Sequence, residues 1–156
     1  MIIKKIGEKN MKIWKILIGL MLMFLLIGTC AAFEVSELKT LDGYNDFDGA
    51  FSNYTTNSNR YFCVEKMGSS MDDIKNDWFT NNTQFKLTVI PVEDNIWYVE
   101  DETFEYYGYQ EVVEDGGEYY MVSINQNSHL SPSEKNEFLK DLQEFNKLNN
   151  LEPVEV

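Results

Sequence analysis

The segment Asp115-Gly116-Gly117 separates two stretches rich in aromatic and β-branched residues, residues 103–114 and residues 118–125. Asp-Gly and Gly-Gly pairs favour the tight turns that join antiparallel strands, because such turns need positive φ at their central residues. The sequence therefore predicts a long hairpin, which makes at least part of the sheet antiparallel. Either pair fits the centre of the turn, and the two choices differ by one residue. Because a one-residue shift exchanges the faces of a strand, the sequence leaves open whether Tyr119 or Tyr120 points inward.

Three further stretches have the composition or alternation of strands. They cover residues 60–67, 85–89 and 96–99. We expect Pro91 to end the second of them, because proline cannot donate to a strand ladder. A short edge strand is expected near residues 47–51, and the polar residues 55–59 are expected to form a loop.

Two helices are predicted. Residues 131–134, Ser-Pro-Ser-Glu, form a capping box with proline at the first helical position, and the pair Asn149-Asn150 ends the helix. Its apolar stripe consists of Phe138, Leu139, Leu142, Phe145 and Leu148. A shorter helix is expected after Ser69 or Ser70, with Met71, Ile74 and Trp78 on one face.

These elements predict an α+β domain in which strands outnumber helices. The simplest packing has two layers, a twisted, mostly antiparallel sheet with the C-terminal helix and the short helix packed on one face. An N-terminal hydrophobic signal or anchor helix precedes it. The chain then divides into residues 1–32, the signal peptide or membrane anchor, and residues 33–156, a single acidic domain.

The first 32 residues carry the signs of export. Five lysines precede a run from Ile16 to Ala32 that holds no charged residue and ends in small side chains. This order is the pattern of a secretory signal cleaved after one of the two final alanines. The run is also close to the minimum length of a membrane span, roughly 17 residues, so a retained anchor formed by residues 12–32 stays open. Met1 and Met11 both remain possible starts.

The two cysteines have different expected fates. Cys30 follows Thr29 in a sequence similar to a lipoprotein box, in which a smaller residue normally precedes the cysteine, and it is removed if the signal is cleaved. Cys63 would then be the single cysteine of the exported domain, so no internal disulfide is expected. Its apolar neighbours favour burial.

The composition excludes several classes of function. The chain has 13 Lys and Arg against 26 Asp and Glu, a net charge of −13, and the exported part holds all the acids except Glu8. Nucleic-acid binding needs a positive face, so no nucleic-acid partner is expected. One His and two Cys are too few for zinc, haem or iron–sulfur patterns. We therefore predict no cofactor and no metal ligands.

The sequence offers little evidence for a catalytic site. Cys63 or Ser128 together with His129 would be needed for nucleophilic catalysis, but an apolar, acidic setting raises rather than lowers a thiol pKa. A pair of carboxylates for sugar hydrolysis cannot be singled out among so many acids. Residues 46–49, Asp-Phe-Asp-Gly, match part of a calcium-binding loop, but the first and last ligand positions of that motif do not fit. No catalytic residue is assigned.

Aromatic side chains give the best indication of binding. Tyr107 and Tyr109 should share one strand face while Tyr106 takes the other, and Trp97 lies on the preceding strand. Exposed Tyr and Trp stack on sugars or anchor peptides. Packing in the core is the competing interpretation, because aromatic residues favour strands for structural reasons.

The segments 35–39, Val-Ser-Glu-Leu-Lys, 111–114, Glu-Val-Val-Glu, and 145–150, Phe-Asn-Lys-Leu-Asn-Asn, with Leu142 and Pro153 around the last, resemble small uncharacterised exported proteins of methanogenic archaea. This resemblance implies an archaeal cell surface and an anaerobic habitat, in which an unpaired Cys63 is unremarkable. It brings no established activity.

Together these features predict an extracytoplasmic domain, secreted or anchored to the membrane, that binds a cell-surface component or partner protein without catalysis. The alternative is a small hydrolase, or an accessory subunit of a surface enzyme, with an unrecognised site.

The small residues at positions 28–32 generate a first prediction. We expect the native protein to begin near Ala32 or Phe33, because a signal peptidase cuts after such residues. Intact-mass measurement of the native protein checks this. Recovery from the membrane of a chain that still begins at Met1 or Met11 would establish the anchor instead.

Overall fold

The computed structural model describes residues 32–68, 70–79, 86–93 and 95–156. The predicted signal or anchor, its alternative starts and the lipidation of Cys30 lie outside the described residues. Within them, no helix has both the length and the apolar character needed to cross a bilayer.

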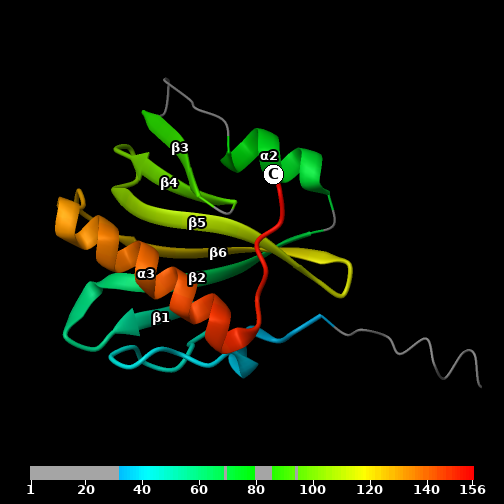
Figure 1. Cartoon of the computed structure of the whole chain (residues 1–156), viewed down its shortest axis with the longest axis horizontal. Helices are drawn as coiled ribbons and strands as arrows, with labels where there is room; N and C mark the ends of the chain where they lie inside the picture. The colour runs from blue at the N-terminus through cyan, green and yellow to red at the C-terminus, as the bar shows by residue number, and fades with distance from the viewer. Residues whose placement is uncertain (1–31, 69, 80–85, 94) are drawn as a thin grey trace, which may run out of the picture. The chain divides into compact units, whose positions relative to one another are not determined.

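Among the described residues, six strands form one antiparallel sheet in the order β1-β2-β6-β5-β4-β3 (Figure 1). Neighbouring strands are consecutive in sequence except β2 and β6, so the chain crosses the sheet once, between β2 and β3. The strands are β1 Phe51–Tyr54, β2 Asn57–Gly68, β3 Leu87–Glu93, β4 Ile96–Asp101, β5 Tyr106–Asp115 and β6 Glu118–Gln126.

The central hairpin of β5 and β6 turns at Gly116 and Gly117, whose φ angles are +60° and +81°. Asp115 pairs with Glu118, which settles the register that the sequence left open. Tyr120 consequently packs in the larger hydrophobic cluster, together with Val113, while Tyr119 faces the other side of the sheet.

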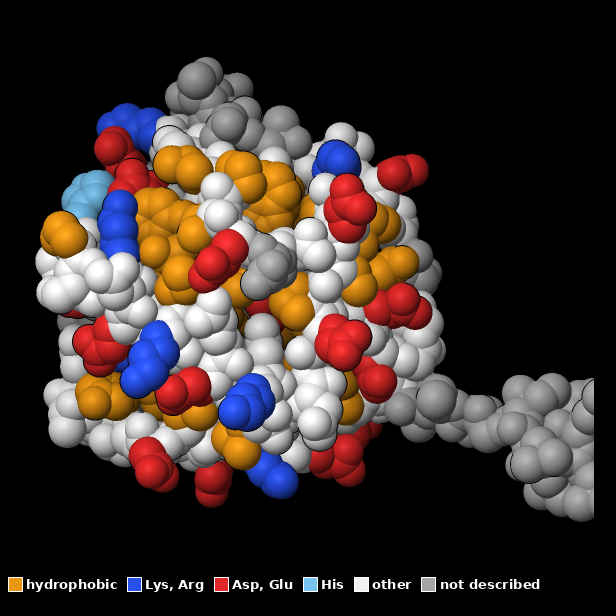
Figure 2. Space-filling view, in the orientation of Figure 1, with side chains coloured by type: hydrophobic (Ala, Val, Ile, Leu, Met, Phe, Trp, Pro, Cys, Tyr) orange, Lys and Arg blue, Asp and Glu red, His pale blue; other side chains and the backbone are white. Residues whose placement is uncertain are grey.

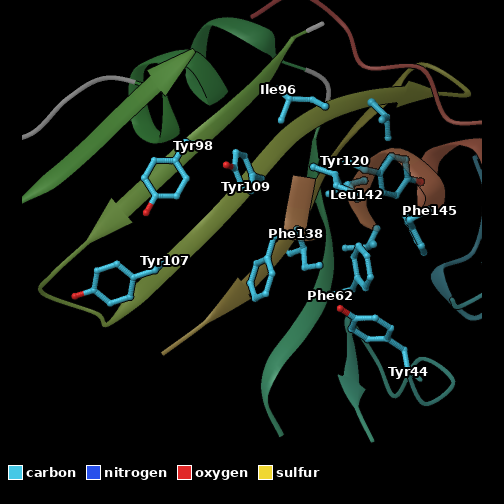
Figure 3. Packing of buried hydrophobic residues seen from close by; sticks show 14 of the residues in the cluster. Tyr44, Phe62, Ile96, Tyr98, Tyr107, Tyr109, Tyr120, Phe138, Leu142 and Phe145 are labelled. Atoms are coloured by element: carbon cyan, nitrogen blue, oxygen red, sulfur yellow. The ribbon is translucent and has the colours of Figure 1, made fainter. Parts of the chain in front are cut away.

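The two helices lie on opposite faces of the sheet, which corrects the prediction that both pack on one face. α3, Pro132–Asn149, and α2, Met71–Trp78, contribute to separate hydrophobic clusters. On the α3 face the fully buried side chains include Phe62, Val122, Ile124, Phe138, Leu142 and Phe145, several of them labelled in Figure 3. On the α2 face the cluster consists of Ile74, Phe79, Val89, Val99 and Val112. β5 supplies alternate residues to both clusters, so both of its faces are buried.

The C-terminal helix begins and ends as predicted. The Ser131 side chain accepts a hydrogen bond from the Glu134 N–H, Glu134 bonds back to the Ser131 N–H, and Asn150 ends the helix in the left-handed conformation. The apolar stripe is buried only as far as Phe145, since the Leu148 side chain is 37% exposed.

Two predictions about strand ends are wrong. Pro91 lies inside β3 and pairs with Trp97, which is possible because β3 is an edge strand and an irregularity in the ladder follows between Pro91 and Glu93. The expected loop over residues 55–59 is a short turn, because Tyr54 already pairs with Asn57 and β2 begins there.

A buried arginine joins β2 to α3 and to the N-terminal segment. Arg60 is only 7% exposed, and its guanidinium donates to the Tyr44 hydroxyl at 2.7 Å, to Glu137 at 2.7 Å and to Asp141. Burial raises the pKa of the Asp141 carboxyl, although Arg60 opposes that shift. The network thus satisfies a charge that would otherwise be costly to bury.

The segment before β1 is hydrogen-bonded on the α3 face both to the C-terminal end of α3 and to the turn of the β5–β6 hairpin. The 3-10 helix η1, Val35–Glu37, is followed by Lys39, whose N–H donates to Asn149 Oδ1 at 2.7 Å while Asn149 Nδ2 donates to the Lys39 carbonyl at 2.9 Å. Phe33 stacks on Tyr120 with ring centroids 4.2 Å apart, and its N–H donates to Asp115.

The burial of α3 generates a second prediction. Leu142 is 0% exposed, so Leu142→Ala should lower the free energy of unfolding by about 2–5 kcal/mol. Leu148→Ala, on the same helix but partly exposed, is the matched control and should cost much less. Denaturant melts measure both. A loss below about 0.5 kcal/mol for Leu142→Ala would show that α3 is not docked.

Candidate functional site

The structure does not bring the four predicted aromatic residues into one site. Tyr107 and Tyr109 lie on the α3 face, as the alternation predicts, and both are only 5% exposed. Tyr106 and Trp97 are half-buried against the opposite cluster. Figure 3 shows Tyr98, Tyr107 and Tyr109 lined up along one side of the sheet. Tyr107 and Tyr109 therefore offer little free ring surface for stacking on a ligand.

Cys63 and His129 also lie apart. The β2 residue Phe62 points to the α3 face, so Cys63 points to the α2 side, whereas the His129 ring contacts Tyr107 on the α3 face. Burial raises the pKa of the Cys63 thiol to about 12, and Glu65 adds to the shift. The thiol is therefore protonated at neutral pH and is not an activated nucleophile.

No metal site is evident in the part of the chain that the structure describes. There, no three His, Cys, Asp or Glu side chains lie close enough together to hold an ion. The fragment of a calcium motif at residues 46–49 instead forms a tight turn, in which Asp48 bridges to Phe51 and Gly49 has a φ of +61°.

The turn between β4 and β5, residues 102–105, presents the most exposed large hydrophobic side chain of the described residues. Phe104 is 74% exposed. The carboxylate of Asp101 holds the turn in shape, because its Oδ1 accepts hydrogen bonds from the N–H groups of Thr103 at 2.8 Å and Phe104 at 3.0 Å. Glu105 then takes a positive φ of +52° before β5 begins. An apolar ring thus stands on a preorganised acidic turn.

Next to this turn, the carboxylate of Glu100 connects three elements. Its Oε1 accepts a hydrogen bond from the Tyr98 hydroxyl at 2.7 Å and lies 3.9 Å from Lys135 Nζ on α3. The same oxygen is 4.0 Å from His129 Nδ1 in the loop before α3. Lys135 Nζ also lies 4.0 Å from the centre of the Tyr98 ring, a cation–π contact.

We call the group formed by Glu100, Phe104, Tyr107, His129 and Lys135 the turn-end surface. In Figure 2 the single histidine, pale blue, lies beside basic and acidic side chains at the border of a hydrophobic patch. The His129 ring packs on Tyr107 with centroids 4.2 Å apart. Burial raises the pKa of Tyr107, and the carboxylates of Glu102 and Glu105 raise it further. The field at this end of the sheet is therefore negative.

A cavity of about 350 Å³ lies elsewhere, between α3 and the N-terminal segment. Its lining residues are Thr40, Leu41, Asp42, Asp141, Glu144 and Leu148. Asp141 is already bonded to Arg60, so this cavity borders the structural arginine network.

Sequence reasoning missed Phe104 and Glu100, since residues 103–114 were expected to form one continuous strand. The available signal was Asp101 ahead of Thr103, because an aspartate often accepts hydrogen bonds from the N–H groups two and three residues later in a turn.

Comparison with protein-family models, with curated proteins and with solved structures finds no match for this chain.

The burial of Cys63 generates a third prediction. In a Cys30→Ser variant of the folded chain, a thiol reagent at pH 8 should label Cys63 far more slowly than it labels the chain unfolded in denaturant, because the thiol is 6% exposed and protonated. Spectrophotometric thiol titration measures the rates. Equal rates in the two states would show an accessible, activated thiol and would revive the nucleophile hypothesis.

Proposed function

We propose that the protein is a non-catalytic, extracytoplasmic interaction module, and that it binds a cationic partner protein through the turn-end surface. The observation that carries this proposal is Phe104, an exposed aromatic ring on a turn whose backbone is fixed by Asp101. Isolated exposed hydrophobic residues are common on protein surfaces. Phe104 differs because the turn is preorganised and several charged and aromatic groups converge beside it.

Preorganisation matters because a fixed loop loses little conformational entropy when a partner binds. Transfer of a Phe ring from water into an apolar pocket contributes about 1.5–3 kcal/mol. A rigid aromatic anchor within a polar rim is the usual arrangement of an interface hot spot.

The acidic residues around Phe104 indicate that the partner is positively charged. Glu100, Asp101, Glu102 and Glu105 lie in or beside the turn, whereas the basic side chains that approach them are Lys86, at 3.2 Å from Glu102, and Lys135. Exposed ion pairs of this kind contribute little stability and are exchanged readily. A basic partner would therefore meet a complementary field, which accelerates association and makes the affinity sensitive to salt.

The hydrolase alternative depends on a different arrangement, either His129 beside Cys63 or two carboxylates sharing a cleft. Cys63 and His129 lie on opposite sides of the sheet, and the His129 ring contacts the Tyr107 ring and the Glu100 carboxylate. No observation among the described residues favours this alternative.

A fourth prediction tests the surface. A photoreactive benzoylphenylalanine replacing Phe104, in cells that produce the chain naturally, should crosslink to a basic protein. The same replacement of Phe51, which is 46% exposed on the edge strand β1, should not. With the identified partner purified, Phe104→Ala should weaken binding roughly tenfold or more, and Phe51→Ala by less than about twofold.

Calorimetry at two salt concentrations gives the affinities, and thermal melts verify that both variants are folded. Equal crosslinking at the two positions, or a partner whose affinity does not change with salt or with Phe104→Ala, would contradict the proposal.

A further inference from the structure

The carboxyl group of Glu111 is buried at the centre of the molecule. Glu111 lies on β5, opposite Val122 of β6, and its side chain is 0% exposed. It points to the α3 face, where Asn146 of the last turn of α3 donates from Nδ2 to Glu111 Oε2 at 2.9 Å. A carboxylate with one hydrogen bond in an apolar core would be a costly arrangement, because burial strongly disfavours the ionised form.

Two atoms of this pair remain unsatisfied. Glu111 Oε1 and Asn146 Oδ1 are both buried and neither has a hydrogen-bond partner. They are the remaining polar atoms of two planar groups that are already joined by one hydrogen bond. Both are acceptors when the carboxyl is ionised, so they would repel each other, and buried acceptors without donors are uncommon in folded proteins.

We propose that Glu111 is protonated in the folded protein and forms a cyclic acid–amide pair with Asn146, so that the docking of α3 depends on this proton. Oε1 carries the proton and donates to Asn146 Oδ1, while Asn146 Nδ2 donates to Oε2. One proton satisfies both orphaned acceptors, and the carboxyl group is buried without a charge.

The surroundings supply no charge that would stabilise the ionised form. The side chains around Glu111 in the α3-face cluster are apolar or aromatic, and the titratable ones among them are Tyr44, Tyr98, Tyr107, Tyr109 and Tyr120. The described charged or titratable groups at the border of that cluster are Arg60 with its partners Glu137 and Asp141, Lys66 on β2, Glu93 on β3, Glu100 on β4 with His129 and Lys135, and Glu144 and Lys147 on α3. None of them shifts the pKa of Glu111. Burial raises that pKa from 4.5 to about 8, and the Asn146 hydrogen bond lowers it only in part.

The direction of the pH dependence follows from the two states. Below about pH 4.5 Glu111 is protonated whether the chain is folded or unfolded, so the full stabilisation is present. Between about 4.5 and 8 the unfolded chain loses the proton and the folded chain keeps it, so unfolding becomes more favourable by about tenfold per pH unit. Above about 8 the folded protein must ionise as well, and the stabilisation is lost.

Because Asn146 lies in the last turn of α3, ionisation of Glu111 would weaken packing at the C-terminal end of that helix. The Asn146 carbonyl accepts the N–H of Leu151 at 2.9 Å just beyond the helix, and Phe145 and Asn149 beside it contact the sheet and the N-terminal segment. Ionisation of Glu111 would therefore loosen the C-terminal turns of α3 first. The capping box at Ser131 is far along the helix and involves neither group.

Glu111→Gln is the decisive variant, because glutamine offers Asn146 the same donor and acceptor without a titratable proton. Urea melts of the purified full chain from pH 5 to pH 9 should show that the variant and the parent are similarly stable at pH 5. The ratio of their unfolding constants should then change about tenfold per pH unit up to about pH 8. Glu114→Gln, an exposed neighbour on the same strand, is the control and should follow the parent at every pH.

A second measurement needs no variant. Carbon-13 NMR of the parent chain, labelled at glutamate side chains, should show one carboxyl carbon at the shift of an un-ionised acid at pH 6.5. Glu111→Gln assigns that signal by removing it. A carboxyl shift for Glu111 of the ionised form at that pH, or pH profiles of parent and Glu111→Gln that run parallel, would overturn the proposal.

Discussion

The register of the β5–β6 hairpin is the constraint on which the other features depend. Gly116 and Gly117 adopt positive φ angles that few other residues tolerate, and this fixes which side chains of both strands face α3. With this register, Tyr107 contacts His129 in the loop before α3, and Glu111 contacts Asn146 in the last turn of α3. A slip of one residue would send both to the α2 face and place Gln110 and Val112 under α3 instead. The candidate surface and the buried carboxyl therefore share one origin in a two-glycine turn.

Local patterns predicted local structure well. The capping box and the end of α3 at Asn150 follow from hydrogen-bonding groups within a few residues of one another, and the main strands follow from local alternation and composition. The arrangement of helices over the sheet was not predictable in the same way. Alternation in β5 shows which residues share a face but does not show which helix covers it. Likewise, Pro91 ends a strand only where its missing N–H would be needed, which depends on β3 being an edge strand.

The candidate site was predicted only in part, for a related reason. Tyr107 and Tyr109 do share a face, but their burial depends on contacts with distant residues, such as His129 and Tyr98, that no strand pattern contains. Phe104 falls in a stretch that the sequence predicts as a strand. The turn is formed by hydrogen bonds from the N–H groups of Thr103 and Phe104 to Asp101, and the Asp-Glu-Thr sequence that makes them is a weak turn signal. No local pattern marks Glu111 as a buried residue. Its burial became visible only with both neighbouring strands and α3 in place.

The fastening of Phe33 has a mechanical consequence. Its N–H is bonded to Asp115 and its ring is stacked on Tyr120, so the chain enters the domain beside the turned end of the central hairpin. If the preceding residues hold the protein to a membrane, a pull on that tether reaches the domain first at these contacts. The ring stack and the two hydrogen bonds of Phe33, to Asp115 and from the Tyr120 hydroxyl, would break before the ladder of β5 and β6. Residues 33–38 would then detach from the domain and extend. The next contact to resist the pull would be the pair of hydrogen bonds between the Lys39 backbone and the Asn149 side chain.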